Sequence, residues 1–232
     1  MIKKPLKTAI FFDYGGTLDA PGLSWKEHFL PIYKKYGIDP DLETFARAFY
    51  ASDDSLVAEN PVHMNLTEIV YEQVSRVLKN LGYFNESITE KIASHFLRDC
   101  FENIKKNLPV LERLRERYRL GIISNNYGNL EAICKETGLK DLMDVLVDSN
   151  LVGKIKPHPE IFQEGLMAIG CRAEEAVMVG DNLRRDIEGA KKVGMDAILI
   201  TSSPFIPENA TSLPMAVIRD IRELDNIFME GD

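Results

Sequence analysis

Residues 7–18 read Lys7-Thr-Ala-Ile-Phe-Phe-Asp13-Tyr-Gly-Gly-Thr-Leu18, and this stretch decides the fold. The run Ala9–Phe12 is apolar and bulky, with no alternation of polar and apolar positions. Such a run is typical of a strand buried on both faces of a parallel sheet. It ends at Asp13, and Gly15 and Gly16 follow almost at once. Open α/β sheets bind ligands at the carboxyl ends of their strands, so Asp13 is the first candidate functional residue.

Composition limits the classes of protein that fit. The 232 residues suffice for one sizeable core, alone or with a smaller inserted domain. A net charge of −8 disfavours nucleic acid and anionic membranes as partners. No apolar run has the length of a membrane span, and the short run after the first lysines is not a signal peptide. The three cysteines are widely spaced and odd in number, so we expect reduced core thiols in a cytoplasmic protein.

The pattern after the first strand is helical. Capping patterns predict three helix starts, namely Ser24 with Glu27, Asp39 with Pro40, and Ser87 with Glu90. The stretches 67–81 and 88–104 each place apolar residues on one stripe of a helix. Two such stripes pack on each other more readily than on a distant sheet. We therefore expect residues 21–105 to form a small α-helical cap domain inserted into the chain.

Strand and helix patterns alternate in the remainder of the chain. The predicted helices are 109–117, 129–137, 159–169, 184–193 and one from Asp220, and the predicted strands are 120–124, 145–147, 176–179, 197–200 and 216–218. Such alternation predicts an α/β fold with a doubly wound parallel sheet. The first strand belongs to this sheet. The predicted Rossmann-like core therefore comprises residues 1–20 and 106–232.

Polar side chains follow the predicted strands at one edge of this sheet. They are Asp13, Ser124, Asn125, Lys156, Asp181 and Asp186. The carboxylates of Asp13 and Asp181 suit a hard divalent cation, which prefers oxygen ligands. Ser124, the amides after it and Lys156 suit a phosphate group. A carboxylate nucleophile that forms an aspartyl-phosphate would need both the cation and the lysine, because nucleophile and phosphate are both anionic.

Together these residues resemble the haloacid dehalogenase superfamily. Asp13-Tyr-Gly-Gly-Thr-Leu is similar to its first motif, Ile123-Ser124-Asn125 to its second, and Lys156-Pro157 to its third. Gly180-Asp181 with Asp186 is similar to its fourth motif. The likeness covers the predicted core, and the helical insert stands where the family carries its cap. The set is specific for the superfamily and says little about the substrate.

The resemblance implies a role for each motif residue. Asp13 would be the nucleophile and a Mg²⁺ ligand, Asp181 the second acidic ligand, and Asp186 a ligand acting through water. Ser124, Asn125 and Lys156 would hold the transferring phosphoryl group. The implied protein is a cytoplasmic Mg²⁺-dependent phosphatase or phosphoryl-transfer enzyme, monomeric or homodimeric, with a small phosphorylated metabolite as its substrate.

Gly15 departs from the family pattern. The family's phosphatases usually carry an aspartate there, which protonates the leaving group and then activates water, while its backbone carbonyl binds the metal. Glycine keeps the carbonyl, so the metal site should survive with a loss of acid–base assistance of about 10²–10⁴-fold. Asp19 or a substrate group would have to replace the carboxyl. Gly15→Asp is accordingly expected to raise activity toward alkyl phosphates, whose leaving groups need a proton.

Two other functions stay open at this stage. A metal-independent dehalogenase would also lack the aspartate at position 15, because halide leaves without a proton, but the acidic fourth motif argues against it. A non-enzymatic relative could keep the pocket only to bind phosphate. The substrate is not encoded in any motif. Packing or surface roles are favoured for each of the five candidates for contact with it, which are Tyr14, Trp25, His28, His63 and Tyr127.

Overall fold

The computed structural model describes residues 6–203 and 213–229. In this part of the chain six strands form one sheet. The strands are β1 (Ala9–Phe12), β2 (Arg119–Ser124), β3 (Val145–Asp148), β4 (Ala176–Gly180), β5 (Asp196–Ile200) and β6 (Ala216–Ile218). All neighbouring strands are parallel, in the order β3-β2-β1-β4-β5-β6. The predicted α/β class and doubly wound, Rossmann-like sheet are confirmed.

Strand β1 lies at the centre of the sheet. It pairs with β2 on one side and β4 on the other, with Phe12 in register with Ile122 and Val179. Its four residues are fully buried, and they alternate between two apolar clusters. Ile10 and Phe12 belong to one cluster, while Ala9 and Phe11 belong to the other. Because both faces are covered, the strand needs apolar residues at every position.

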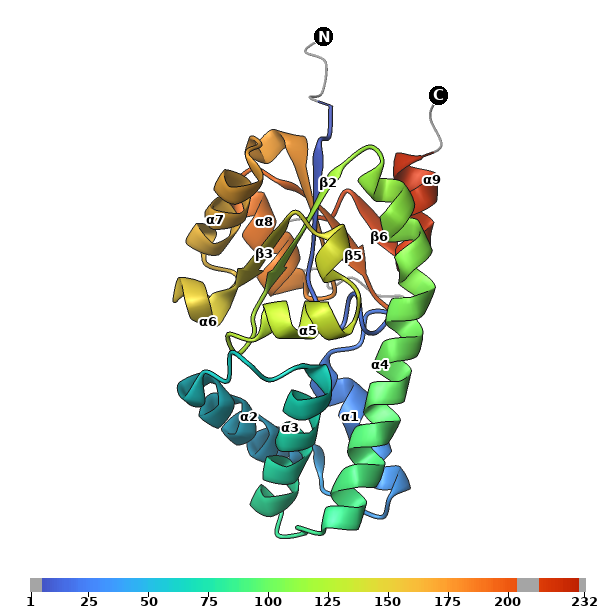
Figure 1. Cartoon of the computed structure of the whole chain (residues 1–232), viewed down its shortest axis with the longest axis vertical. Helices are drawn as coiled ribbons and strands as arrows, with labels where there is room; N and C mark the ends of the chain where they lie inside the picture. The colour runs from blue at the N-terminus through green and yellow to red at the C-terminus, as the bar shows by residue number, and fades with distance from the viewer. Residues whose placement is uncertain (1–5, 204–212, 230–232) are drawn as a thin grey trace.

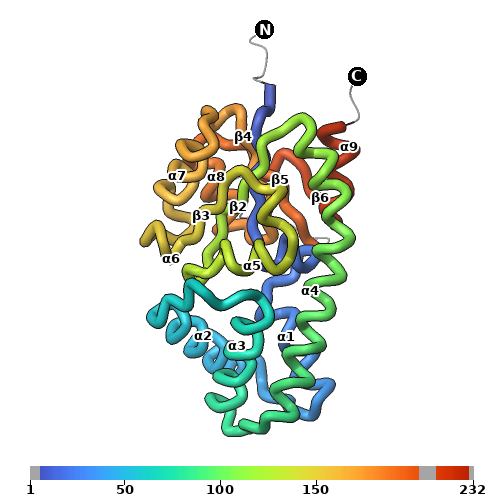
Figure 2. Tube along the Cα trace, viewed as in Figure 1, coloured from blue at the N-terminus to red at the C-terminus, as the bar shows by residue number. Residues whose placement is uncertain are grey.

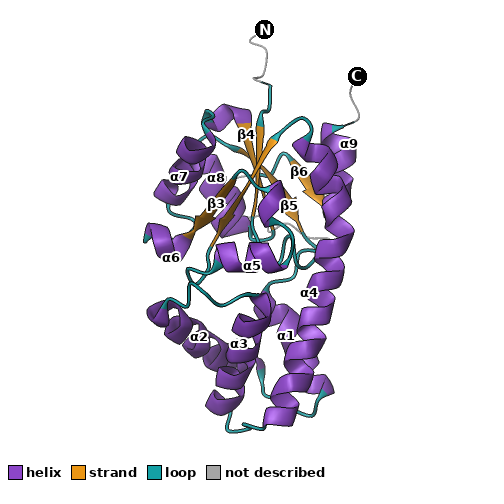
Figure 3. Cartoon of the chain, in the orientation of Figure 1, coloured by secondary structure: helices purple, strands orange, loops and turns teal. Residues whose placement is uncertain are grey.

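Helices cover both faces of the sheet, as Figures 1 and 3 show. The short helices of this half are α5 (Leu130–Glu136), α6 (Ser149–Val152), α8 (Gly189–Lys192) and α9 (Leu224–Phe228), with the longer α7 (Pro159–Ile169). Apolar residues of α7 and α8 pack in the cluster that contains Phe11. Those of α5 and α9 pack in the cluster that contains Phe12. The predicted helix 184–193 is in fact a π-helical turn, Leu183–Glu188, followed by α8.

The other half of the molecule is helical. It consists of α1 (Trp25–Lys35), α2 (Leu42–Glu59), α3 (Leu66–Asn80) and the first part of α4 (Glu86–Arg115), which lie below the sheet in Figure 1. The stripes of α3 and α4 pack on each other as predicted. Polar bonds join this half to the sheet half, among them Asn129 Nδ2 to Met64 O, Thr67 Oγ1 to Glu136, and Asn150 Nδ2 to Val57 O.

Helix α4 differs from the prediction. Residues 88–104 and 109–117 were expected to form two helices, but α4 is continuous over 30 residues with Pro109 inside it. Figure 2 shows it running along both halves of the molecule. The boundary expected between residues 105 and 106 therefore falls inside a helix. Near this point Asn107 Nδ2 donates to Leu18 O at 2.9 Å and ties α4 to the loop after β1.

Two predicted helix starts were displaced by two residues. The second helix is capped by Asp41, whose side chain accepts from Thr44 N, and not by Asp39. Helix α4 is capped by Asn85, whose side chain accepts from Ile88 N, and not by Ser87. In each case another capping residue lies two positions away, and its carboxylate or amide oxygen satisfies a free helix N–H. The box of Ser24 with Glu27 is present at α1.

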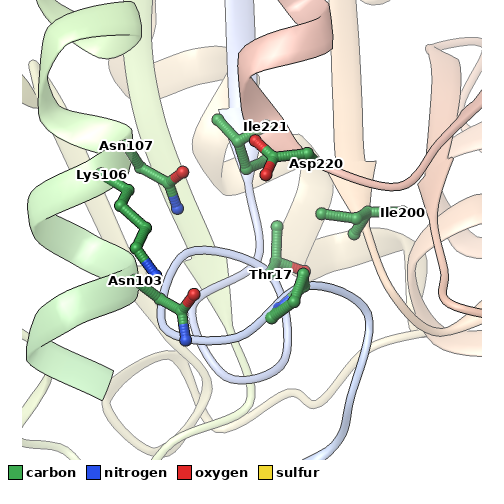
Figure 4. A pocket seen from close by; sticks show the side chains of 8 residues that line it. Thr17, Asn103, Lys106, Asn107, Ile200, Asp220 and Ile221 are labelled. Atoms are coloured by element: carbon green, nitrogen blue, oxygen red, sulfur yellow. The ribbon is translucent and has the colours of Figure 1, made fainter. Parts of the chain in front are cut away.

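A small cavity lies where α4 meets the loop after β1. Figure 4 shows Asn103, Lys106 and Asn107 of α4 on one side and Thr17 on the other. The cavity measures about 10 Å³, which is room for a single water molecule. It is therefore no substrate site. No helix among residues 6–203 and 213–229 is long and apolar enough to cross a membrane.

Candidate active site

Asp13 follows β1 directly and continues its pairing, since its backbone N–H donates to Val179 O at 2.8 Å. Its carboxylate oxygen Oδ1 accepts from Tyr14 N at 2.7 Å and from Ser124 Oγ at 2.9 Å. Lys156 Nζ lies 2.8 Å from the same oxygen. No described residue donates a hydrogen bond to the other oxygen, Oδ2. The carboxylate is thus fixed through one oxygen, and 14% of the side chain remains exposed.

Ser124 and Asn125 come from the end of β2, the neighbour of β1. Parallel register brings Ser124 beside the end of β1, where its hydroxyl donates to Asp13. The side chain of Asn125 binds the backbone of Lys156 twice. Its Oδ1 accepts from Lys156 N at 2.7 Å, and its Nδ2 donates to Lys156 O at 3.2 Å. Asn125 therefore holds the lysine segment against the end of β2.

Lys156 is a buried cation, with only 1% of its side chain exposed. Its Nζ lies 2.8 Å from Asp13 Oδ1 and 2.7 Å from Asp186 Oδ1, although neither contact is aligned as a hydrogen bond. Burial alone would lower the pKa of this ammonium, but the carboxylates of Asp13 and Asp186 outweigh burial and raise it. Lys156 is therefore a permanent positive charge between two strand ends.

Three carboxylates meet at this edge. One oxygen each from Asp13, Asp181 and Asp186 lies within 4.8 Å of the others. Burial, together with the charges of Asp186 and Asp13, raises the pKa of Asp181 to about 8. Burial also raises the pKa of Asp186, to about 6, although Lys156 opposes it. One lysine leaves the cluster with an excess of negative charge, which favours a bound cation.

Two glycines allow the loops to approach so closely. Gly16 has φ +84°, and a Cβ there would lie 2.6 Å from Asp181 Oδ2. Gly180 lies against the carboxyl group of Asp186, and a Cβ there would overlap it. Side chains at these two positions would push the acidic residues apart. The positive φ that glycine permits is thus needed at Gly16.

Gly15 lies two residues from Asp13 and is not in the left-handed region of backbone conformation. A Cβ at this position would lie 3.3 Å from Nε1 and 3.4 Å from Cδ1 of Trp25. Asp19, the sequence-based candidate for the missing carboxyl, is fully buried. Its Oδ1 accepts from Gly16 N at 2.7 Å and its Oδ2 from Trp25 Nε1 at 2.6 Å. Both oxygens of Asp19 already have partners.

Sequence reasoning missed the residue that shapes the loop after β2. Asp148, at the end of β3, accepts hydrogen bonds from the backbone N–H groups of Gly128, Leu130 and Asn150. Burial raises the pKa of Asp148, and these backbone donors oppose that rise. An acidic residue at the end of one more buried strand was the available signal. Asp148 holds the loop that carries Asn125, and it lies outside the acidic cluster.

Tyr127 joins the same loop to the helical half. Its hydroxyl donates to Asp53 Oδ1 of α2 at 2.6 Å, and Gln73 Nε2 of α3 donates to the same oxygen at 2.8 Å. Burial raises the pKa of Asp53 to about 6. Tyr127 is 9% exposed, which agrees with the packing role that was favoured for it.

Comparisons with known proteins agree with this arrangement. The family described as haloacid dehalogenase-like hydrolase matches residues 10–200. The glyceraldehyde 3-phosphate phosphatase of Methanothermobacter thermautotrophicus is 32% identical over 236 residues, which cover 95% of this chain and 99% of that protein. The crystal structure of a HAD phosphatase from Thermococcus onnurineus has a TM-score of 0.57 and 27% identity, covering 97% of this chain and 99% of the other. A dehalogenase crystallised with an intermediate complex has a TM-score of 0.67 at 18% identity over both whole chains, a likeness of fold alone.

This chain belongs to the haloacid dehalogenase-like hydrolase family. It is a hydrolase, and its relatives named by function make it phosphatase-like.

Proposed function

We propose that this protein is a Mg²⁺-dependent phosphatase that cleaves a small phosphorylated metabolite through an aspartyl-phosphate on Asp13. One observation carries the proposal, namely that Asp13 stands between a cation-binding and a phosphate-binding set of side chains. Ser124 and Lys156 contact its Oδ1, and Asp181 and Asp186 lie within 4.8 Å. A carboxylate with this surrounding suits nucleophilic attack on an anionic phosphate.

The acidic cluster fits a magnesium ion. Its donors are carboxylate oxygens, which hard cations prefer. Burial, and next the charge of neighbouring carboxylates, raises the pKa values of Asp181 and Asp186, and a bound cation would offset both effects. Asp13 and Asp181 would bind the ion with their carboxylates, Gly15 with its backbone carbonyl, and Asp186 through water. When bound, the ion would neutralise charge on the phosphate and lower its repulsion from Asp13.

The phosphate would be held by Ser124 and Lys156. The ammonium of Lys156 supplies positive charge beside Asp13, and the hydroxyl of Ser124 supplies a hydrogen bond. Asn125 was predicted to bind phosphate with them. Because its side-chain amide is bound to the Lys156 backbone on both sides, we assign it to positioning the lysine.

The reaction would proceed in two displacements at phosphorus. An oxygen of Asp13 forms a bond to phosphorus while the bond to the leaving-group oxygen breaks, and the leaving group departs with that electron pair. Water then attacks phosphorus of the aspartyl-phosphate, and the bond from phosphorus to Asp13 breaks with its electron pair left on the carboxylate. Inorganic phosphate leaves, and the proton lost from the water passes to the solvent. Lys156 stays charged throughout and stabilises both the phosphate and the freed carboxylate.

The rest of the chain would set the substrate. We propose that residues 21–105 act as the cap and that residues 1–20 and 106–232 act as the catalytic core. The helical half meets the site edge through Trp25 and through Tyr127 with Asp53. A relative named for glyceraldehyde 3-phosphate supports a small phosphorylated substrate. We further propose a cytoplasmic protein that acts as a monomer or homodimer.

Phosphate release from p-nitrophenyl phosphate tests the proposal. Release should need Mg²⁺, stop on chelation, and fall by at least about 10³-fold in Asp13→Asn. Lys154→Met is a matched control, because Lys154 is half-exposed and pairs only with Glu160 among the described residues. Metal-independent halide release from a 2-haloacid would establish a dehalogenase instead. Phosphate binding without turnover of either substrate would indicate a non-enzymatic protein.

A further inference from the structure

The space beside Gly15 is occupied by Trp25, the single tryptophan of the chain. The pyrrole edge of the indole lies where a residue-15 side chain would begin, at 3.3 Å and 3.4 Å from the Cβ position. The backbone of Gly15 is not left-handed, so its conformation does not exclude a side chain. Space is therefore the constraint at this position. An aspartate would need room for a carboxyl group beyond that Cβ.

The indole is held from two sides and has little freedom to withdraw. Its Nε1 donates at 2.6 Å to Asp19 Oδ2, a carboxylate with no exposed surface. Its ring packs edge-on against Phe96 at 5.3 Å and Phe29 at 6.2 Å between centroids. Phe29 and Phe96 are themselves stacked at 3.8 Å. Moving the indole would leave a buried carboxylate oxygen without its donor and would disturb this aromatic cluster.

The resemblance to the family implies that a residue-15 carboxyl meets the leaving group, so the indole beside Gly15 would lie on that side of the site. In-line displacement places the leaving group opposite the attacking oxygen of Asp13. The core side of the phosphate position is occupied by Ser124 and Lys156. The leaving group would then extend toward the loop of Gly15 and the first turn of α1, where Trp25 lies.

We propose that Trp25 is a specificity-determining residue that takes the space of a residue-15 carboxyl on the leaving-group side of the site. This inference rests on the proposed phosphatase function. Asp19 does not replace the missing carboxyl, because both of its oxygens are bound by Gly16 and Trp25. The site then selects phosphates whose leaving groups are stable anions, such as aryl, acyl or phosphoryl groups, over simple alkyl phosphates.

The structure changes the expectation for Gly15→Asp. The Cβ of the new residue already lies 3.3 Å from the Trp25 indole, so we expect the carboxyl beyond it to be crowded. The single variant should then gain less than about threefold in kcat/KM for methyl phosphate. The double variant Gly15→Asp with Trp25→Ala should gain at least about tenfold for methyl phosphate and much less for p-nitrophenyl phosphate. Gly15→Asp with Phe84→Ala is the control, because Phe84 is an exposed aromatic residue of the helical half.

A second experiment does not depend on turnover. Gly15→Ala adds only the Cβ, and it should lower the melting temperature in wild type but not in Trp25→Phe, which lacks the contacting nitrogen. Because Trp25 is the single tryptophan, its emission reports directly on this contact. Emission should change in Gly15→Ala and on addition of orthovanadate with Mg²⁺. This measurement applies even if the double variant with aspartate does not fold.

The outcomes separate this inference from the proposed function. An equal gain for methyl phosphate in Gly15→Asp and in the double variant would overturn the role of Trp25, while Mg²⁺-dependent turnover would still stand. Additive effects of Gly15→Ala and Trp25→Phe on melting temperature would overturn it as well. Absence of Mg²⁺-dependent phosphate release in wild type would refute the phosphatase itself.

Discussion

Lys156→Met is the sharpest perturbation of the charge balance at the site. The substitution keeps an unbranched side chain of similar length but removes the cation that lies 2.8 Å from Asp13 and 2.7 Å from Asp186. Three carboxylates within 4.8 Å of one another then have no cation from among the described residues beside them. Removing one partner of a buried ion pair typically costs about 3–5 kcal/mol. We expect a loss of this size in the free energy of unfolding without metal.

The loss should depend on pH and on Mg²⁺. The pKa of Asp181 is already raised to about 8 and that of Asp186 to about 6, so protonation relieves the repulsion at low pH. The destabilisation should thus be larger at pH 8 than at pH 6. Magnesium would supply part of the missing positive charge and should stabilise Lys156→Met more than it stabilises wild type.

Urea denaturation at both pH values, with and without Mg²⁺, measures these effects. Lys154→Met is the matched control, since Lys154 is half-exposed and its pair with Glu160 spans 3.3 Å. An exposed pair of this kind contributes about 0–1 kcal/mol. Equal losses in the two variants, or an Mg²⁺ effect no larger in Lys156→Met than in wild type, would refute the account of the cluster.

Three further predictions follow from the same site. Asp13→Asn should leave melting temperature within a few degrees of wild type while phosphate release from p-nitrophenyl phosphate falls to background; activity within tenfold of wild type would contradict the nucleophile. In calorimetric titration, Mg²⁺ affinity should fall more in Asp181→Asn than in Asp186→Asn, because Asp186 already pairs with a lysine; an unchanged affinity in the first variant would contradict this. Burial raises the pKa of Asp19 to about 7, so the folded protein retains a proton there that the unfolded chain releases near pH 4. Its contribution to stability is complete below about pH 4 and is lost as pH rises through 7, at up to about 1.4 kcal/mol per pH unit. Asp19→Asn should flatten the decline in unfolding free energy from pH 5 to 8, and an equally steep decline in that variant would exclude Asp19 as its source.

The side chains at the edge of the sheet could be predicted because each buried strand is an apolar run that ends at a polar residue. A strand buried on both faces must be apolar throughout, and a polar residue then marks where it ends. Parallel pairing brings those ends together, so Asp13 and Ser124 came within hydrogen-bond distance as their positions suggested. The pattern could not distinguish a residue that faces the pocket from one that supports it. Asn125, which turned out to bind the Lys156 backbone, is the example.

The continuity of α4 was hidden by Pro109. The predicted helix 109–117 begins at Pro109, and a proline at the first position of a helix has no N–H to lose. Yet the buried residues Cys100, Ile104, Asn107, Leu111 and Leu114 keep one helical stripe on both sides of it. Packing along that stripe outweighs the one hydrogen bond that proline removes. The apolar stripe can be read in the sequence on both sides of Pro109, and it predicts one continuous helix better than the proline predicts a break.

The contact of Trp25 with Gly15 had no signal in the sequence. The residues are ten positions apart and belong to different elements, and no local pattern specifies which face of α1 meets the loop after β1. Compared with the family motif, Gly15 lacks the carboxyl group that an aspartate would supply at this position. In the structure an indole held by Asp19 lies 3.3 Å from the Cβ position of residue 15, and we propose that it replaces the carboxyl. If the two occupants are true alternatives, a natural relative with aspartate at the position of Gly15 must carry a smaller or differently placed residue where this chain has Trp25. A relative that has both an aspartate at the position of Gly15 and a tryptophan at the position of Trp25 would contradict this. It would show that the loop after β1 can move away from α1 and make room for both side chains.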